Sequence, residues 1–173
     1  MGSPLSVTFA NFFMAEVENQ ALNNLENKPA MYVRYIDDIF VSCDENVLEL
    51  LKKELELISG LHFTVENSID RKIPFLNVLV ENTAERFKTT VYRKPTDIGA
   101  CMNGSGDVPD QYKASVNKGF LHRARTLSTD KTDMLIEIKR AKQILVNNGY
   151  SNNEVDTEVK RFLQNNTKTD SSS

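Results

Sequence analysis

The stretch that decides the fold is Met31-Tyr32-Val33-Arg34-Tyr35-Ile36-Asp37-Asp38-Ile39-Phe40-Val41-Ser42. β-Branched and aromatic residues on both sides of two acids are typical of two short strands joined by a tight turn. The stretch therefore predicts a hairpin with Asp37 and Asp38 at its tip, where short side chains are held at a fixed point.

Helices are predicted on both sides of this hairpin. Before it, Ser3 can cap a helix that ends near Asn23, and Pro4 suits the first helical position. Apolar residues recur there at helical spacing and are expected to face the core: Leu5, Phe9, Phe12, Phe13 and Val17. After the hairpin, Asp44 and Gly60 are expected to bound a second amphipathic helix.

The remaining chain divides into short strands and then helices. Three strands are predicted, at 61–66, 74–81 and 86–93. Glycine-rich residues 97–108 read as a linker, residues 109–164 as a helical cluster, and the polar tail 165–173 as disordered. The fold class is therefore α+β, with a mixed lobe over 1–96 followed by an all-α lobe.

Charge is distributed unevenly along the 173 residues. Residues 1–85 hold 14 Asp and Glu against 6 Lys and Arg, whereas residues 86–142 hold 12 Lys and Arg against 6 acids. An acidic first half suits metal ions or nucleotides and a basic second half suits a phosphate backbone, although two ordinary solvated faces would give the same sums. The net charge of −3 excludes a uniformly basic nucleic-acid-coating protein.

Cysteine usage and hydropathy bear on the compartment. Cys43 and Cys101 show no metal-ligand spacing, which favours a reduced, intracellular chain in either nucleus or cytoplasm. No run approaches the roughly 18 apolar residues of a membrane span, so no membrane partner is expected.

The paired aspartates suggest metal chemistry. Like charges at Asp37 and Asp38 repel, and Mg²⁺ or Mn²⁺ removes that penalty because hard cations prefer carboxylate oxygens. Two such ions about 3.5–4 Å apart support phosphoryl transfer. The plainer interpretation is an Asp-rich β-turn, which is common.

Several motifs together resemble a reverse transcriptase of the Penelope-like retroelement type. Residues 1–6 are similar to its motif B, and Tyr35-Ile36-Asp37-Asp38 is similar to its metal-binding motif C. Residues 63–66, 73–78 and 90–96 are similar to later palm blocks, and the helical segment around His122 is similar to its thumb. The resemblance implies a partial palm over 1–96 and a helical thumb over 109–164.

The resemblance also implies roles for individual residues. Asp37 and Asp38 would be catalytic and bind Mg²⁺ or Mn²⁺, held weakly. The nucleotide and template pocket would contain Gly2, Ser3, Pro4 and Tyr35. The primer grip would contain Phe75 and Leu76. The nucleic-acid backbone would be bound by Arg93, Lys94, Arg123, Arg125, Lys139, Arg140 and Lys142. Partners would be an RNA template, a DNA primer or duplex and deoxynucleoside triphosphates.

Three functional hypotheses follow. A two-metal polymerase needs a third carboxylate and fingers, which the family carries upstream of motif B. The first hypothesis is therefore an RNA-directed DNA polymerase fragment that is inactive alone, unless a fingers-bearing upstream chain completes it. The second is a non-catalytic nucleic-acid-binding module that uses the basic surface of 86–142. The third is a generic α+β interaction protein.

Overall fold

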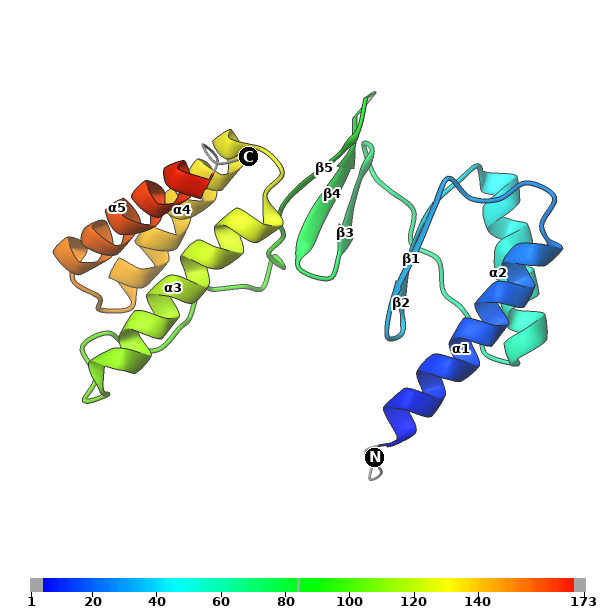
Figure 1. Ribbon diagram of the computed structural model, residues 1–173, viewed down its shortest axis with the longest axis horizontal. Coiled ribbons are helices and arrows are strands. Elements are labelled where there is room, and N and C mark those ends of the chain that lie inside the picture. The colour runs from blue at the N-terminus through cyan, green and yellow to red at the C-terminus, as the bar shows by residue number, and fades with distance from the viewer. Residues whose placement is uncertain (1–4, 84, 170–173) are drawn as a thin grey trace. The chain divides into compact units, whose positions relative to one another are not determined.

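The computed structural model of the chain (Figure 1) describes residues 5–83 and 85–169, except for the side chains of 166–169. It divides into two compact units, Met1–Asn67 and Ser68–Ser173. Each unit has its own antiparallel sheet and its own helices, which confirms the α+β class. None of the helices in the described part combines the length and apolar character that a membrane crossing needs.

The first unit is a hairpin between two helices. Its elements in chain order are α1 (Leu5–Asn24), β1 (Met31–Tyr35), β2 (Asp38–Ser42) and α2 (Glu45–Ser59). The predicted hairpin is confirmed, with Tyr35 opposite Asp38 at its closed end. α2 begins after Asp44, as predicted, and ends at Gly60, whose φ of 69° is the left-handed conformation that glycine adopts without a steric cost.

The core of this unit uses only the second half of α1. Val17 and Ala21 of α1 pack against Leu51 and Leu55 of α2, with apolar residues of the hairpin around them. Two hydrogen bonds to one acceptor add to this packing, because Glu18 Oε1 accepts from the Tyr32 hydroxyl at 3.0 Å and from Arg34 Nε at 2.5 Å. Burial, together with the Glu18 carboxylate, raises the pKa of Tyr32 above its ordinary value.

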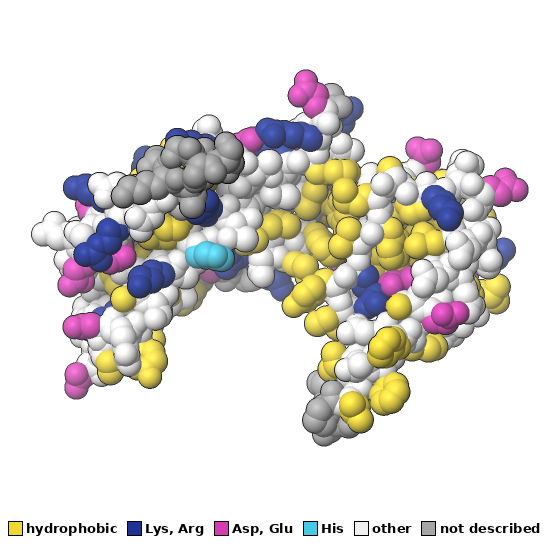
Figure 2. Space-filling view, viewed as in Figure 1, with side chains coloured by type: hydrophobic (Ala, Val, Ile, Leu, Met, Phe, Trp, Pro, Cys, Tyr) yellow, Lys and Arg dark blue, Asp and Glu magenta, His cyan; other side chains and the backbone are white. Residues whose placement is uncertain are grey.

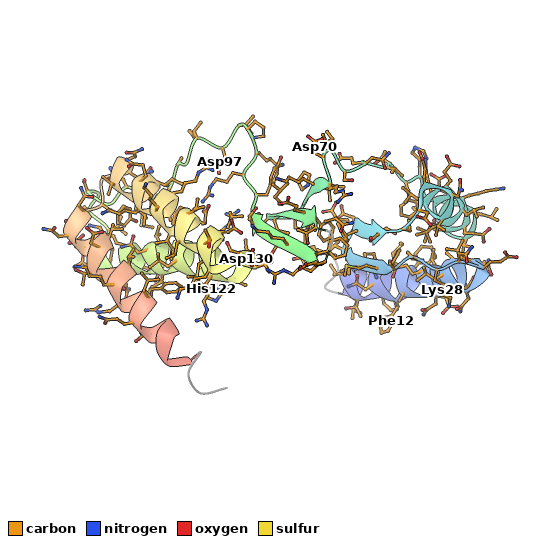
Figure 3. All side chains as sticks on the ribbon, turned by 90° about the horizontal axis from the view of Figure 1, so that it is seen from above. Phe12, Lys28, Asp70, Asp97, His122 and Asp130 are labelled. Carbon is orange, nitrogen blue, oxygen red and sulfur yellow. The ribbon has the colours of Figure 1, made fainter. Side chains whose placement is uncertain are left out.

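The first half of α1 is exposed, so the prediction that its phenylalanines belong to the core is wrong. Phe9, Phe12 and Phe13 are 67%, 70% and 50% exposed. Hydrophobic side chains gather on this half of the helix in Figure 2, and Phe12 projects away from the strands in Figure 3. Helical spacing correctly predicted the helix, but burial also requires a neighbouring element, and α2 packs only along the Val17–Ala21 side.

The predicted strand at 61–66 is also wrong, because this segment pairs with no strand in the described part of the chain. It is fastened to α2 by the Glu56 carboxylate instead. Glu56 Oε1 accepts from the Phe63 N–H at 2.9 Å and lies 2.9 Å from His62 Nδ1. The Phe63 N–H, helped by Lys52 and His62, lowers the pKa of Glu56.

This contact makes stability depend on pH. Because the folded pKa of Glu56 is lowered, its contribution is present above the unfolded-state value of about 4.3 and is lost as pH falls through the folded value. In Glu56→Gln the free energy of unfolding is expected to fall less steeply between neutral and acid pH than in the native chain. Urea unfolding followed by circular dichroism at several pH values measures this dependence. Glu49→Gln is the control, since Glu49 is an exposed carboxylate of the same helix. If the free energy of unfolding of Glu56→Gln falls with pH as steeply as that of the native chain, the role given to Glu56 is contradicted.

The second unit begins with a three-stranded antiparallel sheet in the order β3-β4-β5. Its strands are β3 (Lys72–Phe75), β4 (Val78–Asn82) and β5 (Phe87–Val91). The single strand predicted at 74–81 is therefore wrong, since the chain reverses at Leu76 and Asn77. Leu76 has a φ of 55°, a conformation in which glycine or asparagine is usual, so its identity gave no signal of a turn. Pro74 is tolerated because β3 is an edge strand.

Three helices complete the second unit: α3 (Asp110–Leu127), α4 (Lys131–Asn147) and α5 (Asn152–Thr169). Two clusters of buried residues hold them together, one around Leu121, Ala124 and Ile138 and one around Leu145, Tyr150 and Val155. α5 continues to Thr169, through residues expected to be disordered, because 165–169 contain no glycine or proline to end it. Residues 170–173 lie outside the described part.

The segment expected to be a linker, 97–108, lies within the second unit. Asn148 fixes it, since its side-chain amide donates to the Gly99 carbonyl at 2.9 Å and its Oδ1 accepts from the Cys101 N–H at 3.2 Å. The Gly104 N–H donates to the Asn148 carbonyl at 2.8 Å. The boundary between compact units lies instead between Asn67 and Ser68, which differs from the expected division at 97–108.

Candidate nucleic-acid interface

The hairpin tip of the first unit carries the aspartates singled out in the sequence. Ile36 and Asp37 form the two-residue turn, and Asp38 begins β2 opposite Tyr35. All four side chains are exposed. The Arg34 guanidinium stiffens the tip by donating to the Ile36 carbonyl at 3.0 Å, and Ile36 has a φ of 57°, which costs a β-branched residue conformational energy.

A metal at this tip stays a prediction. Across residues 5–83 and 85–169, no group of three or more His, Cys, Asp or Glu side chains comes close enough to bind an ion together. Gly2, Ser3 and Pro4, which were expected to shape a nucleotide pocket, lie outside the described residues. Carboxylates at Asp37 and Asp38 and the side chain of Tyr35 therefore form an exposed polar tip without a described neighbour that completes a site.

The second unit contains all of the cations predicted to bind the nucleic-acid backbone. Some of them are ion-paired within the unit, and others are exposed or line a pocket. Arg93 has a side chain only 7% exposed, paired with Glu137 of α4 and lying 3.6 Å from Asp97. Lys142 is paired with Asp156 of α5 at 2.6 Å. These two cations are already neutralised by acids of the same unit, so their first role in the structure is to join elements.

The other predicted cations face outward or line a pocket. Lys139 and Arg140 are exposed on α4, and Arg125 is exposed on α3. Lys94 is exposed after β5, and Arg123 of α3 donates from Nη2 to the Tyr92 carbonyl at 3.3 Å. Their contact with nucleic acid stays a prediction.

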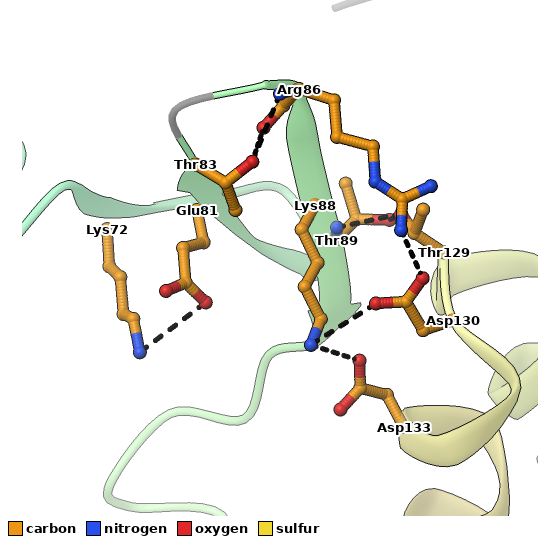
Figure 4. A network of polar contacts seen from close by, with 9 residues as sticks. All are labelled: Lys72, Glu81, Thr83, Arg86, Lys88, Thr89, Thr129, Asp130 and Asp133. Carbon is orange, nitrogen blue, oxygen red and sulfur yellow. Dashed lines mark hydrogen bonds and ion pairs between the residues drawn. The ribbon is translucent and has the colours of Figure 1, made fainter.

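The turn between α3 and α4 is fastened to β5, as Figure 4 shows. Thr89 and Thr129 form two hydrogen bonds, since the Thr129 N–H donates to the Thr89 carbonyl at 2.9 Å and the Thr89 N–H donates to the side-chain Oγ1 of Thr129 at 2.8 Å. Arg86 pairs with Asp130 at 2.6 Å. The start of α4 is therefore held at a fixed position on the sheet.

Lys88 of β5 forms further ion pairs with the start of α4. Its ammonium lies 2.8 Å from Asp133 and 3.3 Å from Asp130 (Figure 4), and these carboxylates raise the pKa of Lys88. The two acids within α4, Asp133 and Glu137, thus both bind cations of the sheet or of the segment that follows it. Their negative charge is neutralised on the side of the helix that faces the sheet.

The solvent-exposed side of α4 has a different chemistry. Residues separated by three, four or seven positions lie on one side of a helix, and on α4 this spacing joins six exposed residues. We call these residues the α4 face: Thr132, Ile136, Lys139, Arg140, Gln143 and Asn147. It carries two cations, two amides and no acid, and Gln143 donates to Asn147 at 2.8 Å.

A similar face lies on α3. The same spacing joins exposed residues that we call the α3 face: Gln111, Ser115, Lys118, Gly119, His122 and Thr126. Figure 3 shows His122 on the outer side of this helix. Between Gln111 and Thr129 the sequence has four Lys and Arg and no Asp or Glu. Two consecutive helices therefore expose polar, acid-free faces.

A pocket of about 360 Å³ is lined by Arg123 of α3 together with residues of the β3–β4 turn and of the segment 92–97. It brings together four residues that the sequence had singled out separately, namely Leu76, Arg93, Lys94 and Arg123. Phe75, the other residue of the expected primer grip, ends β3 and is not among the residues that line the pocket.

Some residues of this surface were not predicted as site residues from the sequence. Lys118, Ile136 and Asp97 were not singled out, and Asn77 and Tyr92 entered only as members of the blocks 73–78 and 90–96. The acid-free run of α3 could have identified Lys118, because a helix without acids among its cations is visible in the sequence. The pocket residues come from three separate segments, which only the fold brings together.

Comparison with protein families finds a similarity in the helical region. Residues 101–160, which contain α3, α4 and half of α5, match the animal helix-turn-helix domain. The match covers 60 of the 173 residues. No curated protein and no solved structure matches the chain.

This match corrects the interpretation of the sequence. Residues expected to form a polymerase thumb are similar to a helix-turn-helix domain, and the family found is not a reverse transcriptase. The resemblance to a Penelope-like reverse transcriptase is therefore wrong. Its motifs were short, and their strongest element, the Tyr35–Asp38 tetrad, is also what an ordinary acidic hairpin turn provides.

Proposed function

We propose that this chain is a non-catalytic nucleic-acid-binding module whose second unit binds duplex DNA through the α4 face. One observation carries the proposal. Both acids within α4 are neutralised by Lys88 and Arg93 on the side toward the sheet, which leaves the solvent-exposed α4 face with two cations, two amides and no acid. The helix lies within the segment that is similar to a helix-turn-helix domain.

The α4 face has the side chains that base recognition uses. In helix-turn-helix proteins the second helix enters the major groove, and the first helix crosses the backbone. Arg140 and Lys139 suit guanine or phosphate, Gln143 suits adenine, and the methyl-bearing side chain of Ile136 suits thymine. The three-residue connection 128–130 between α3 and α4 has the length of a helix-turn-helix turn.

α3 suits the backbone-binding role. Its exposed face offers Lys118 together with hydroxyl, amide and imidazole groups, and it presents no acid that would repel phosphate. Hydrogen bonds of this kind to phosphate fix the position of a protein on DNA without reading its sequence. α5 is a weaker candidate for the groove, because Glu154 is exposed near its beginning, beside Asp156 and Glu158, which pair with Lys142 and Arg161.

The test is fluorescence anisotropy of labelled duplex DNA over a series of salt concentrations. Lys139→Ala/Arg140→Ala is expected to weaken binding by about tenfold or more and to reduce the slope of log K against log salt by about 2, because two phosphate or base contacts are lost. Lys160→Ala is the matched control, since it removes an exposed lysine from α5. Gln143→Ala should alter sequence preference and leave the salt slope unchanged.

The same assay separates the competing function, a protein-interaction module. That reading is favoured by the exposed apolar first half of α1, which has no role in binding DNA. Absence of salt-dependent DNA binding, or equal losses in the α4 double variant and in Lys160→Ala, would overturn the proposal in favour of this alternative.

A further inference from the structure

The pocket beside α3 has an excess of positive charge. Arg93, Lys94 and Arg123 all line it, together with one carboxylate from Asp97. Glu137, which does not line the pocket, also pairs with Arg93, so three cations face two acids. At about 360 Å³ it is at the lower end of the range of small-molecule pockets, about 300–1,000 Å³. Its walls come from the β3–β4 turn, from the segment 92–97 and from α3, all within the second unit.

Two guanidinium nitrogens at this pocket are buried and have no hydrogen-bond partner among the described residues. They are Nη1 of Arg93 and Nε of Arg123; Nη2 of Arg93 also forms no hydrogen bond of good geometry, but it is ion-paired with Glu137. Arg93 is more than nine-tenths buried, and its other contacts, to Glu137 and Asp97, leave Nη1 unpaired. A buried donor without an acceptor is costly, so the site is short of acceptor oxygens.

The neighbouring groups define the ligand further. Lys94 is exposed at the same pocket and adds a mobile cation to the two planar guanidinium groups. Arginine and lysine together match the several oxygens of a phosphate group, and charge-assisted hydrogen bonds to phosphate are among the strongest that proteins make. Asn77 and Tyr92 supply an amide and an aromatic ring at the same walls.

We infer that this pocket binds a phosphate group, and that in the proposed complex it holds a phosphate of the nucleic-acid strand. The second clause rests on the proposed function, whereas the first does not. Arg123 provides the link between them, because it belongs to α3, the helix whose outer face is proposed to follow the DNA backbone.

The test uses the full chain labelled for NMR, titrated separately with inorganic phosphate, with a nucleoside monophosphate and with duplex DNA. Phosphate is expected to shift the backbone amides of 92–97. Arg123→Gln is expected to weaken phosphate binding by about tenfold. Asp97→Asn is expected to strengthen it several-fold, because it removes the only carboxylate at the pocket and keeps the oxygen that accepts from the Gly99 N–H at 2.9 Å.

An increase in affinity cannot come from a damaged fold, so Asp97→Asn keeps the inference testable if Arg123→Gln is unstable. Lys53→Ala, which removes an exposed lysine of the first unit, is the control and should leave phosphate binding unchanged. If phosphate does not shift 92–97, or if both pocket variants bind it as the native chain does, the pocket inference is overturned.

The outcomes for DNA are separate. If DNA binding depends on the α4 face but inorganic phosphate does not bind at the pocket, the pocket inference fails and the proposed function stands. If phosphate binds at 92–97 and DNA does not bind, the proposed function fails and the pocket remains a site for a free phosphate or a mononucleotide, which the second titration identifies.

Discussion

Replacing Glu137 with alanine is expected to lower the free energy of unfolding by about 3–5 kcal/mol, because it leaves the buried guanidinium of Arg93 without its main partner. Side-chain exposure is 11% for Glu137 and 7% for Arg93, so little water can replace the lost carboxylate. The pair joins α4 to the segment after β5, and its loss should separate these elements. Urea unfolding followed by circular dichroism measures the change, and amide hydrogen exchange locates it in α4.

Two comparisons make this expectation specific. Asp156→Ala breaks the pair between α4 and α5, but Lys142 and Asp156 are 36% and 45% exposed, so the expected cost is only about 0–1 kcal/mol. Arg93→Met combined with Glu137→Leu removes both buried charges and should recover much of the stability lost in Glu137→Ala. A loss below about 1 kcal/mol in Glu137→Ala would show that solvent reaches the pair.

The elements that the sequence predicted well are those whose signals are local. The hairpin at 31–42, α2 and the helical cluster at 109–164 depend on alternation, helical spacing and end residues within one segment. The β3–β4 turn was missed because Leu76 occupies a conformation with positive φ in which glycine or asparagine is usual. The segment 61–66 has the composition of a strand but no strand beside it.

The candidate site was predicted less completely, because it depends on contacts between distant segments. Arg93 was expected to bind a phosphate backbone, yet its nearest acid is Glu137 on another element. In the sequence, Asp133 and Glu137 add two negative charges to the helical region. Only the fold shows that Lys88 and Arg93 neutralise them. The pattern of exposed charge therefore differs from the pattern of total charge.

Gly104→Ala is expected to lower the free energy of unfolding by about 1–3 kcal/mol, because a methyl group has no room at this position. An added Cβ would lie 2.7 Å from the backbone nitrogen and from the ring of Tyr150. Tyr150 is only 4% exposed and packs with Leu145 and Val155, so it cannot move aside without opening the contact between α4 and α5. Thermal and urea unfolding measure the effect.

Gly119→Ala is the matched control and should have the opposite sign. Gly119 lies within α3, and an added Cβ there meets no atom within 4 Å. Alanine should therefore stabilise the helix by about 0.5–1 kcal/mol relative to glycine. A neutral Gly104→Ala would show that 97–108 is the linker that its glycines predict. A loss at Gly104 with a gain at Gly119 would instead show that this segment is a fixed part of the second unit, held between the sheet and the turn before α5.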